Sequence, residues 1–330
     1  MTMNQSNDLQ QRLMRPLLWS ILAAIAIYGV SVVASDFQAV TESLGKLSLL
    51  DWSIVLGLSL VNYGLRFIRW EIYLNRLQSR IPPLRSLAYY LGGFAFTTTP
   101  GKAGEAVRSL YLKRHGVSYT ASLAAFFTER FTDLVAMVLL ALVAAISFPE
   151  YQWLVIAITV FILAMLPFIH LRSFHALINR YLHKLSSEKL RNFGLKILDL
   201  LVSASTLLRS GPLYAGLGLG VVAWAAEGVA FYVILHSLEI ETSVEMAVGI
   251  YSVSVLAGAI SFIPGGLGGT EAVMVLLLTL IGADTSAAIA ATLICRLATL
   301  WFAVLIGGMI IASLEVIDKN KNFQAPDVQS

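Results

Sequence analysis

Two stretches of this sequence place a proline–glycine break and a glutamate inside otherwise apolar runs. The first is Thr98-Thr-Pro-Gly-Lys-Ala-Gly-Glu105, and the second is Phe262-Ile-Pro-Gly-Gly-Leu-Gly-Gly-Thr-Glu271. Non-helical backbone at membrane depth is tolerated only where protein buries it or a water-filled cavity reaches it. An ionisable residue there is costly and generally functional. Two such breaks in corresponding halves of a chain are typical of a transporter-type binding site.

The glycines of the two breaks predict backbone that can approach a ligand closely. Glycine tolerates positive φ, and helices beginning near Gly104 and Gly269 would present free N–H groups and positive dipole ends. Such ends suit an anion such as phosphate. The alternative is a pair of glycine hinges that serve helix packing only. The residues assigned to the breaks are Gly101, Lys102, Gly104, Pro264, Gly265, Gly266, Gly268 and Gly269.

Arginines and carboxylates inside the apolar runs could bind and release a charged group. Arg66 and Arg69 are three residues apart and share a helical face, and arginine binds phosphate with two parallel hydrogen bonds. Intramembrane charges are functional by default, although ion pairs that only fix helix packing are the alternative. The candidate binding arginines are Arg66, Arg69, Arg108, Arg130 and Arg296. The carboxylates that would neutralise them in an empty site are Glu105, Glu129, Asp133, Glu227 and Glu271.

Composition places the chain among membrane proteins. Of its 330 residues, 57% are apolar and 13% are charged, which excludes disorder and is unusual for a soluble domain. A net charge of +3 without a basic–aromatic platform argues against nucleic-acid binding. The single cysteine, Cys295, excludes an intrachain disulfide, and no Cys/His cluster has metal-site spacing. We therefore expect no metal and no cofactor.

Apolar runs of about 20 residues predict membrane-spanning helices. The predicted full spans are 17–34, 52–70, 118–148, 152–169, 214–236 and 286–312. Two further runs are interrupted by the breaks and predict broken hairpins, at 84–114 and 246–281. We expect a loop at 35–50 and a loose tail at 318–330. The run 17–34 is a first span rather than a cleaved signal peptide, because it is long and lacks a clean A-x-A site.

The segment 171–210 differs from the rest of the chain. Between Arg172 and Arg209 it holds seven basic residues against two acidic ones. Leucine and isoleucine recur there at helical spacing, which predicts amphipathic helices on the membrane surface. An ordinary basic cytoplasmic loop is the alternative. If the N-terminus is cytoplasmic, the basic loops lie inside and the acidic loop 239–245 lies outside, so both termini are expected in the cytoplasm.

An internal repeat relates the two halves of the chain. A shift of 166 residues places Glu105 on Glu271 and Arg130 on Arg296 without a gap. Each half then contains three spans and a broken hairpin, so the halves have opposite orientations; chance similarity between apolar helices is the alternative. We predict an all-α polytopic membrane protein with inverted repeats, about six full spans plus two re-entrant hairpins. The repeats cover about 16–148 and 151–312 of a single membrane domain, 1–330.

Together these motifs resemble the flippase-like transmembrane family, the membrane region of lysylphosphatidylglycerol synthases, which also occurs as stand-alone bacterial and archaeal proteins. The resemblance covers roughly residues 17–312. It is carried by Arg66, Arg69-Trp70, Pro100-Gly-Lys-Ala-Gly-Glu105, Arg108, Glu129-Arg130-Phe-Thr-Asp133, Pro264-Gly-Gly-Leu-Gly-Gly-Thr-Glu271 and Arg296. It implies movement of a charged or sugar-bearing lipid between leaflets. We expect a stand-alone member that does not itself make an aminoacyl lipid, so the synthases' lysyl-lipid substrate is not carried over.

The leading functional hypothesis is a lipid flippase or translocase of the cell inner membrane. A phosphate-containing or otherwise polar headgroup would pass between the hairpins while the acyl tails stay in lipid. One alternative is a secondary transporter of a small anionic solute, which needs an aqueous vestibule. Another is an intramembrane lipid-modifying enzyme using Glu129 and Asp133, but no activated nucleophile supports it and we do not expect an enzyme. The expected partner is a membrane phospholipid or a lipid-linked substrate, not nucleic acid.

Overall fold

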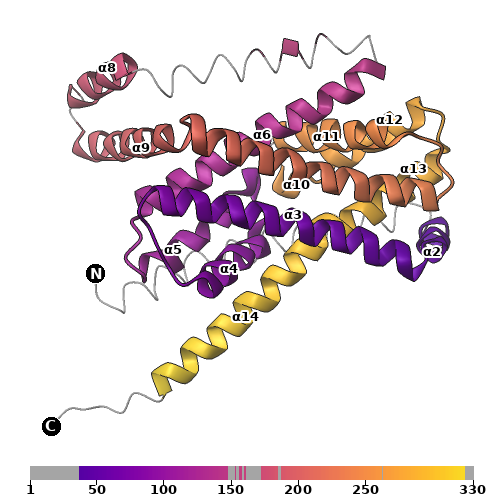
Figure 1. The fold of residues 1–330 in the computed structure, drawn as a ribbon, viewed down its shortest axis with the longest axis horizontal. Coiled ribbons are helices and arrows are strands. Elements are labelled where there is room, and N and C mark those ends of the chain that lie inside the picture. Colours follow the sequence, from indigo (N-terminus) through magenta and orange to yellow (C-terminus); the bar gives the residue numbers. More distant parts are fainter. Residues whose placement is uncertain are drawn as a thin grey trace.

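The computed structural model describes residues 37–147, 172–184, 187–261 and 263–323, with isolated helical residues at 153, 156, 157 and 160. Every regular element in these ranges is a helix, and together they form an elongated bundle (Figure 1). The predicted span 17–34 lies outside the described residues, as does most of the predicted span 152–169. The all-α prediction is confirmed for the described part of the chain.

Two long helices form the spine of the bundle. Helix α3 spans Leu49–Arg76 and α10 spans Ser210–Ser237, each with 28 residues, so each is about 42 Å long. They run in opposite directions (Figure 1), and among the described elements they share the most extensive contact. Close approach depends on glycines of α10. A Cβ at Gly216 would collide with the Tyr73 hydroxyl, and one at Gly220 would lie 2.8 Å from Nη1 of Arg69.

The start of α3 is fixed by a capping box. The Ser48 hydroxyl accepts a hydrogen bond from the Asp51 amide, and the Ser48 amide donates to Oδ2 of Asp51 at 2.9 Å, which satisfies two otherwise free N–H groups. Hydrogen bonds from Ser48 lower the pKa of the Asp51 carboxyl below its ordinary value. The helix therefore begins at Leu49 instead of the predicted residue 52.

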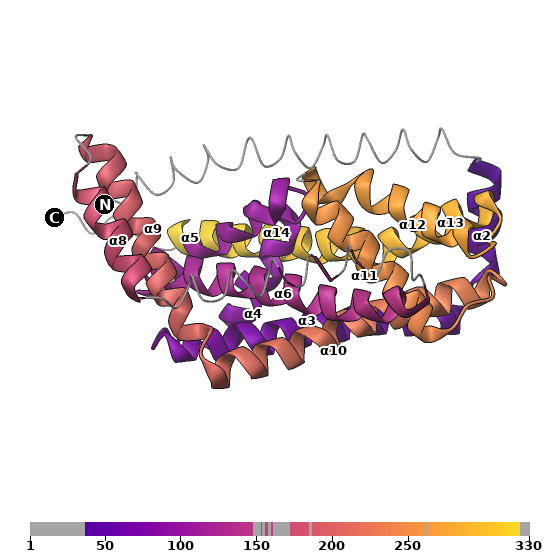
Figure 2. The same ribbon diagram turned by 90° about the horizontal axis from the view of Figure 1, so that it is seen from above.

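The first break folds into a hairpin that returns to the end of the bundle at which it starts. It consists of α4 (Pro83–Gly92), the short 3-10 helices η1 (Gly93–Phe96) and η2 (Pro100–Val107), and α5 (Arg108–Lys113). Figures 1 and 2 both place α4 and α5 in one half of the bundle, on the side of α8 and α9. The long helix α6 (Tyr119–Ser147) follows and agrees with the predicted span 118–148.

The second break forms a hairpin in the opposite half of the bundle. Its parts are α11 (Val244–Ile260), η4 (Pro264–Gly266) and α12 (Gly269–Leu280), and they lie on the side of α2 in Figures 1 and 2. The last predicted span divides into α13 (Thr285–Arg296), a π-helical turn η5 (Leu297–Trp301) and α14 (Phe302–Phe323). The two hairpins thus point towards each other from the two ends.

Each hairpin packs on a long helix from the other half of the chain. Helix α6 packs on α11, whereas α14 packs on α4 and η1. The two breaks also meet directly, because η2 contacts η4. Consequently the centre of the bundle is built from both breaks at once.

Two sequence predictions about the connecting segments are wrong. Residues 35–50 were expected to form a loop, but Phe37–Lys46 forms helix α2, which packs on α13. The stretch 37–46 has no proline, and tertiary contact decides the state of so short a helix. The tail was expected to be loose over 318–330, but α14 continues to Phe323, because the polar residues that follow the apolar run are also compatible with a helix; the rest of the tail, 324–330, lies outside the described residues.

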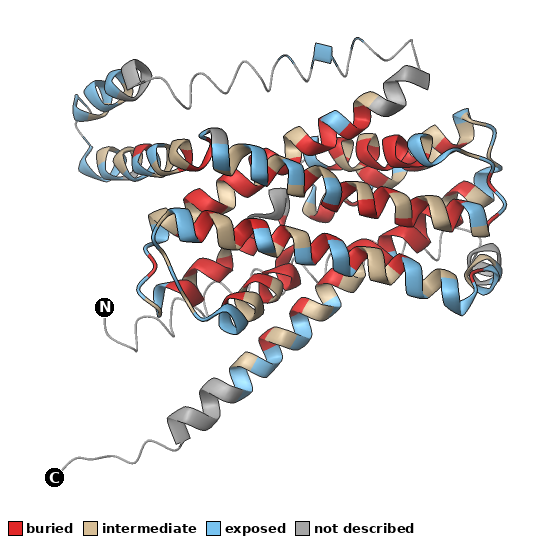
Figure 3. Ribbon diagram, viewed as in Figure 1, coloured by how far each residue is buried: buried red, intermediate tan, exposed pale blue. Residues whose placement is uncertain are grey.

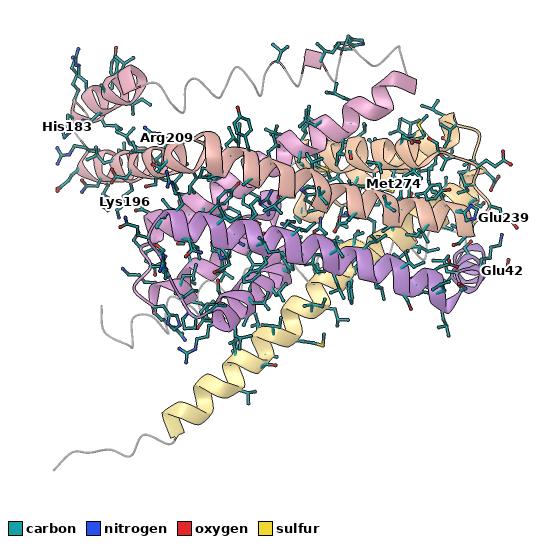
Figure 4. The ribbon with its side chains drawn as sticks, in the orientation of Figure 1. Glu42, His183, Lys196, Arg209, Glu239 and Met274 are labelled. Carbon is teal, nitrogen blue, oxygen red and sulfur yellow. The ribbon has the colours of Figure 1, made fainter. Side chains whose placement is uncertain are left out.

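A large cluster of buried apolar residues lies where α6, α10 and α11 pack together, and Figure 3 shows buried residues concentrated in the middle of the bundle. Two helices in the described ranges have the length and composition to cross a membrane, at Gly211–Ser237 and Thr285–Val316, and Val244–Ile260 and Pro264–Leu280 are shorter apolar helices. The basic segment folds into α8 (Arg172–His183) and α9 (Glu188–Leu207). Figure 4 shows His183, Lys196 and Arg209 at one end of the bundle and Glu42 and Glu239 at the other.

Candidate functional site

Asp133 of α6 is the centre of a buried network between α3, α6 and α10. Nη2 of Arg69 donates to its Oδ1 at 2.6 Å, and Nε1 of Trp224 donates to the same oxygen at 2.9 Å. Nη2 of Arg66 lies 3.8 Å from Oδ2. The spacing of Arg66 and Arg69 along α3 therefore brings both guanidinium groups to one carboxylate, as the shared helical face predicts.

Glu129, one turn before Asp133, is held by the first hairpin. The guanidinium of Arg108 forms an ion pair with Oε2 of Glu129, and the Tyr90 hydroxyl donates to Oε1 at 2.5 Å. Arg108 also lies over the Trp70 ring, with Cζ 3.9 Å from the ring centroid. Because Arg108 and Tyr90 come from α5 and α4, this carboxylate fixes both arms of the hairpin to α6.

Arg130 connects the network to the first break. Its Nη2 lies 3.1 Å from Asp133, 3.3 Å from Glu129 and 3.6 Å from Oε2 of Glu105 in η2. The other oxygen of Glu105 accepts a hydrogen bond from the Thr97 hydroxyl at 2.9 Å. The first half of the site thus joins four arginines to three carboxylates, leaving one formal positive charge; these are Arg66, Arg69, Arg108, Arg130, Glu105, Glu129 and Asp133.

The second break carries a smaller and tighter cluster. Nε of Arg296 donates to Oε1 of Glu271 at 2.6 Å, and its Nη2 donates to the Gly265 carbonyl at 2.6 Å. Oε2 of Glu271 accepts a hydrogen bond from the Gly268 amide at 2.7 Å. The backbone at Gly265 and Gly268 has φ values of 68° and 85°, a region that side chains with a Cβ rarely occupy. The glycines therefore allow the turn that brings a carbonyl to Arg296.

A cavity of about 40 Å³ lies between the two clusters, large enough for a few water molecules. Charged groups from both halves of the chain line it: Arg66 and Glu105 from the first half, and Glu227 and Arg296 from the second. The remaining lining residues are Tyr63, Phe94, Thr97, Trp224, Tyr251, Val255, Thr299, Leu300 and Ala303. Residues that are remote in sequence therefore share one polar chamber near the meeting point of the breaks.

Arg66 has the most unused hydrogen-bonding capacity of the groups that line this cavity. It is 4% exposed, yet its Nε and Nη2 have no hydrogen-bond partner among the described residues. Its Nη1 donates one long hydrogen bond, of 3.5 Å, to Oδ1 of Asn62. The rings of Trp224 and Phe94 enclose the guanidinium, with centroids 5.1 and 5.4 Å from Cζ. Oε2 of Glu105 is likewise buried without a hydrogen bond.

The helix N-termini at the two breaks differ from the free ends that the sequence predicts. At the second break, α12 begins at Gly269, but the carboxylate of Glu271 already occupies its N-terminus. At the first break, the stretch around Gly104 and Glu105 is 3-10 helical, and the α-helix begins only at Arg108. At each break one backbone N–H group is therefore used locally: the Gly268 amide donates to Glu271, and the Gly104 amide donates to Thr99.

The predicted role of Gly104 also needs correction. Its φ is not among the positive values; instead, a Cβ there would lie 2.7 Å from Cβ of Phe96 and Cγ2 of Thr99. The Gly104 amide donates to Oγ1 of Thr99 at 2.6 Å. This glycine therefore permits tight folding of the first break. Pro264 and Gly266 form η4, while the side chain of Lys102 lies outside the described residues.

Sequence reasoning missed the aromatic hydrogen-bond donors of the site. Tyr90 and Trp224 bind Glu129 and Asp133, and the Tyr251 hydroxyl donates to Glu227. Glu227 was expected to neutralise an arginine. In the structure its carboxylate accepts a hydrogen bond from the Tyr251 hydroxyl, and both Glu227 and Arg296 line the cavity. A tyrosine or tryptophan inside an apolar helix could have indicated these contacts, because a buried O–H or N–H needs an acceptor.

Comparison with known proteins agrees with this architecture. The sequence profile described as the lysylphosphatidylglycerol synthase TM region matches residues 18–307. A UPF0104 membrane protein of Methanothermobacter thermautotrophicus is 24% identical over 83% of this chain and 87% of its own length. Another, from Methanocaldococcus jannaschii, is 30% identical over 69% of this chain and 98% of its own length.

A phosphatidylglycerol lysyltransferase of Bacillus subtilis also matches, at 26% identity over 29% of this chain and 11% of its own length. This match is confined to a small part of the lysyltransferase, so it bears on ancestry and not on the reaction. The profile match over 18–307 includes both the charged network around Asp133 and the two glycine breaks. The chain is therefore a helical membrane protein that belongs to the lysylphosphatidylglycerol synthase TM region family.

Proposed function

We propose that this protein is a lipid flippase, which moves a phosphate-containing or otherwise polar-headgroup lipid between the leaflets of the cell inner membrane without modifying it. The observation that carries the proposal is Arg66 on the wall of the cavity between the breaks, a buried guanidinium whose Nε and Nη2 donate no hydrogen bond to the described residues, although Nη2 lies within 3.8 Å of the carboxylates of Glu129 and Asp133. An unsatisfied buried charged donor is costly. A ligand oxygen that accepts from these nitrogens would remove that cost.

The reciprocal packing of the hairpins supports an inverted repeat. Helix α6 packs on the second hairpin and α14 on the first, and α3 runs antiparallel to α10. Inverted repeats with broken helices meeting near the midplane are a common basis for alternating access. In this proposal the hairpins are re-entrant, and rocking of one half against the other exposes the cavity to each leaflet in turn.

The orientation that we propose places both termini in the cytoplasm. Lys196 and Arg209 lie at the end of the bundle that carries α8 and α9, whereas Glu239 lies at the opposite end (Figure 4). Lysine and arginine in short loops favour the cytoplasmic side. Cysteine labelling from either side of sealed vesicles would test this orientation.

Arg66→Ala in proteoliposomes tests the proposed function. The vesicles contain a trace of phosphatidylglycerol with a fluorescent acyl chain, and a membrane-impermeant reductant reports how much of it reaches the outer leaflet. Hydrogen bonds to charged groups contribute about 1.5–3 kcal/mol, so we expect exchange to be slower by a factor of roughly 10 to 100 for Arg66→Ala. Arg66→Lys should recover only part of the rate, because lysine lacks the planar fork.

Arg76→Ala is the matched control, since Arg76 is an exposed arginine of the same helix. It should exchange lipid at the wild-type rate. Wild-type rates in Arg66→Ala would refute the assignment of the site. Uptake of labelled inorganic phosphate by the same vesicles, without lipid exchange, would replace the flippase proposal with a small-anion transporter.

A further inference from the structure

Helices α8 and α9 form an elbow that crosses one end of the bundle. Figure 2 shows both helices steeply inclined to α3 and α10. Helix α9 packs on α6, and α8 packs on α9. Neither helix belongs to the charged network or to the cavity. A helix that lies across the end of a membrane bundle is oriented to lie along the membrane surface.

An apolar stripe on α9 continues beyond the part of the helix that the bundle covers. Ala204 and Leu208 of this stripe are buried, with exposures of 0% and 2%. Ile197 lies one heptad before Ala204 and Leu190 lies two heptads before it, so all three residues are on the same side of the helix. The exposed fraction is 44% for Ile197 and 59% for Leu190. The stripe is therefore half covered by protein and half uncovered within the described structure.

Helix α8 adds a second apolar surface that is mixed with basic groups. Leu177 and Tyr181 are exposed and lie four residues apart, on one helical face. Arg180 and Lys184 are also exposed, and Nζ of Lys184 lies 5.7 Å from the centroid of the Tyr181 ring. Leucine and tyrosine beside lysine and arginine are typical of helices that lie at a lipid–water interface.

The net positive charge of the α8–α9 elbow favours binding to an anionic surface. Residues 172–209 hold seven basic and two acidic side chains. The exposed basic members whose side chains are described are Arg180, Lys184, Lys189, Lys196 and Arg209. Anionic lipids attract such clusters when they lie within a Debye length of the leaflet.

We propose that the α8–α9 elbow is an interfacial anchor that binds the anionic phospholipid surface of the leaflet at this end of the bundle. Leu177, Tyr181, Leu190 and Ile197 insert among the upper parts of the acyl chains. The lysine and arginine side chains reach the phosphates beside them. A protein partner is disfavoured, because the uncovered stripe continues directly from the helix packing of a membrane bundle and shares its face with basic residues.

Site-specific fluorescence in the full-length protein tests this anchor. Cys295 is buried, so a Cys295→Ala background receives one new cysteine, either Leu190→Cys on the stripe or Asn192→Cys on the opposite side of α9. Each is labelled with an environment-sensitive dye and placed in nanodiscs of phosphatidylcholine with or without phosphatidylglycerol. Asn192 is exposed like Leu190 and is the matched control.

With brominated acyl chains, we expect at least about two-fold stronger quenching at position 190 than at position 192. The difference should grow with the fraction of phosphatidylglycerol and shrink at high salt, because salt screens surface charge. Lys189→Gln with Lys196→Gln should remove most of that lipid dependence while leaving the protein folded. Equal quenching at the two positions would overturn the anchor. If quenching at position 190 does not change with the fraction of phosphatidylglycerol or with salt, the proposed preference for anionic lipid is wrong.

Discussion

Arg296 is joined to Glu271 by a hydrogen bond of 2.6 Å, whereas the corresponding pair in the first half, Arg130 and Glu105, is 3.6 Å apart and shares no hydrogen bond. The difference follows from competition: Arg130 also faces Glu129 at 3.3 Å and Asp133 at 3.1 Å. A hydrogen bond from Arg296 thus holds the second break, whereas the first break has no hydrogen bond from Arg130, and the arms of the first hairpin are held through Glu129 instead. The two ion pairs that the predicted repeat relates to each other therefore differ in hydrogen bonding.

Double-mutant cycles on unfolding should reveal this asymmetry. For Arg296→Ala with Glu271→Ala we expect a coupling free energy of about 3 kcal/mol, because a buried hydrogen-bonded pair leaves an uncompensated charge when one partner is removed. For Arg130→Ala with Glu105→Ala we expect about 1 kcal/mol or less, since Arg130 keeps two other carboxylates. Unfolding in mixed detergent micelles, followed by circular dichroism, measures both. Equal couplings would contradict the asymmetry.

Two glycines of α10 should respond differently to alanine. A Cβ at Gly220 would lie 2.8 Å from Nη1 of Arg69, whereas one at Gly218 meets nothing within 4 Å. We expect Gly220→Ala to displace Arg69 from Asp133 and to lower the free energy of unfolding by about 1–3 kcal/mol, with slower lipid exchange. Gly218→Ala should be neutral or slightly stabilising, because alanine favours a helix. Similar losses in both variants would argue that backbone flexibility matters instead.

Arg108 should be irreplaceable by lysine. Its guanidinium forms an ion pair with Glu129 and lies over the Trp70 ring at 3.9 Å, and only a planar cation can do both well. Arg108→Ala should lower the free energy of unfolding by about 3–5 kcal/mol, and Arg108→Lys should recover less than half of it. The exposed Arg114, at the C-terminal end of α5, is the control. Thermal unfolding in detergent gives both values, and full rescue by lysine would rule out the stacking argument.

Trp224 should matter through its indole N–H. Trp224→Phe keeps an aromatic face beside Arg66 but removes the donor that binds Asp133 at 2.9 Å. We expect a loss of about 1.5–3 kcal/mol in the free energy of unfolding, the usual range for a hydrogen bond to a charged group. Trp52→Phe, at a half-buried position of α3, should change it by less than about 0.5 kcal/mol. If both substitutions have the same effect, ring size and not the hydrogen bond explains the loss.

The helices and most of the charged cluster could be predicted from the sequence. Apolar runs indicate the helices because burial or lipid contact is the main driving force for them, and the predicted span 118–148 differs little from α6 at Tyr119–Ser147. The spacing of Arg66 and Arg69 likewise predicts their common face. Helix α2 could not be predicted, because a helix of ten residues depends on what it packs against.

The sequence by itself determined that the chain is an all-helical membrane protein with two glycine breaks, each followed by a glutamate and an arginine in the same register. Its local patterns carry this information, since periodicity and helix breakers act over a few residues. Only the tertiary structure decided that Arg66 and Arg296 line one cavity. It also decided that the carboxylate of Glu271 accepts a hydrogen bond from the Gly268 amide at the start of α12. Such outcomes depend on which groups compete for each hydrogen bond in three dimensions, and sequence spacing does not encode that competition.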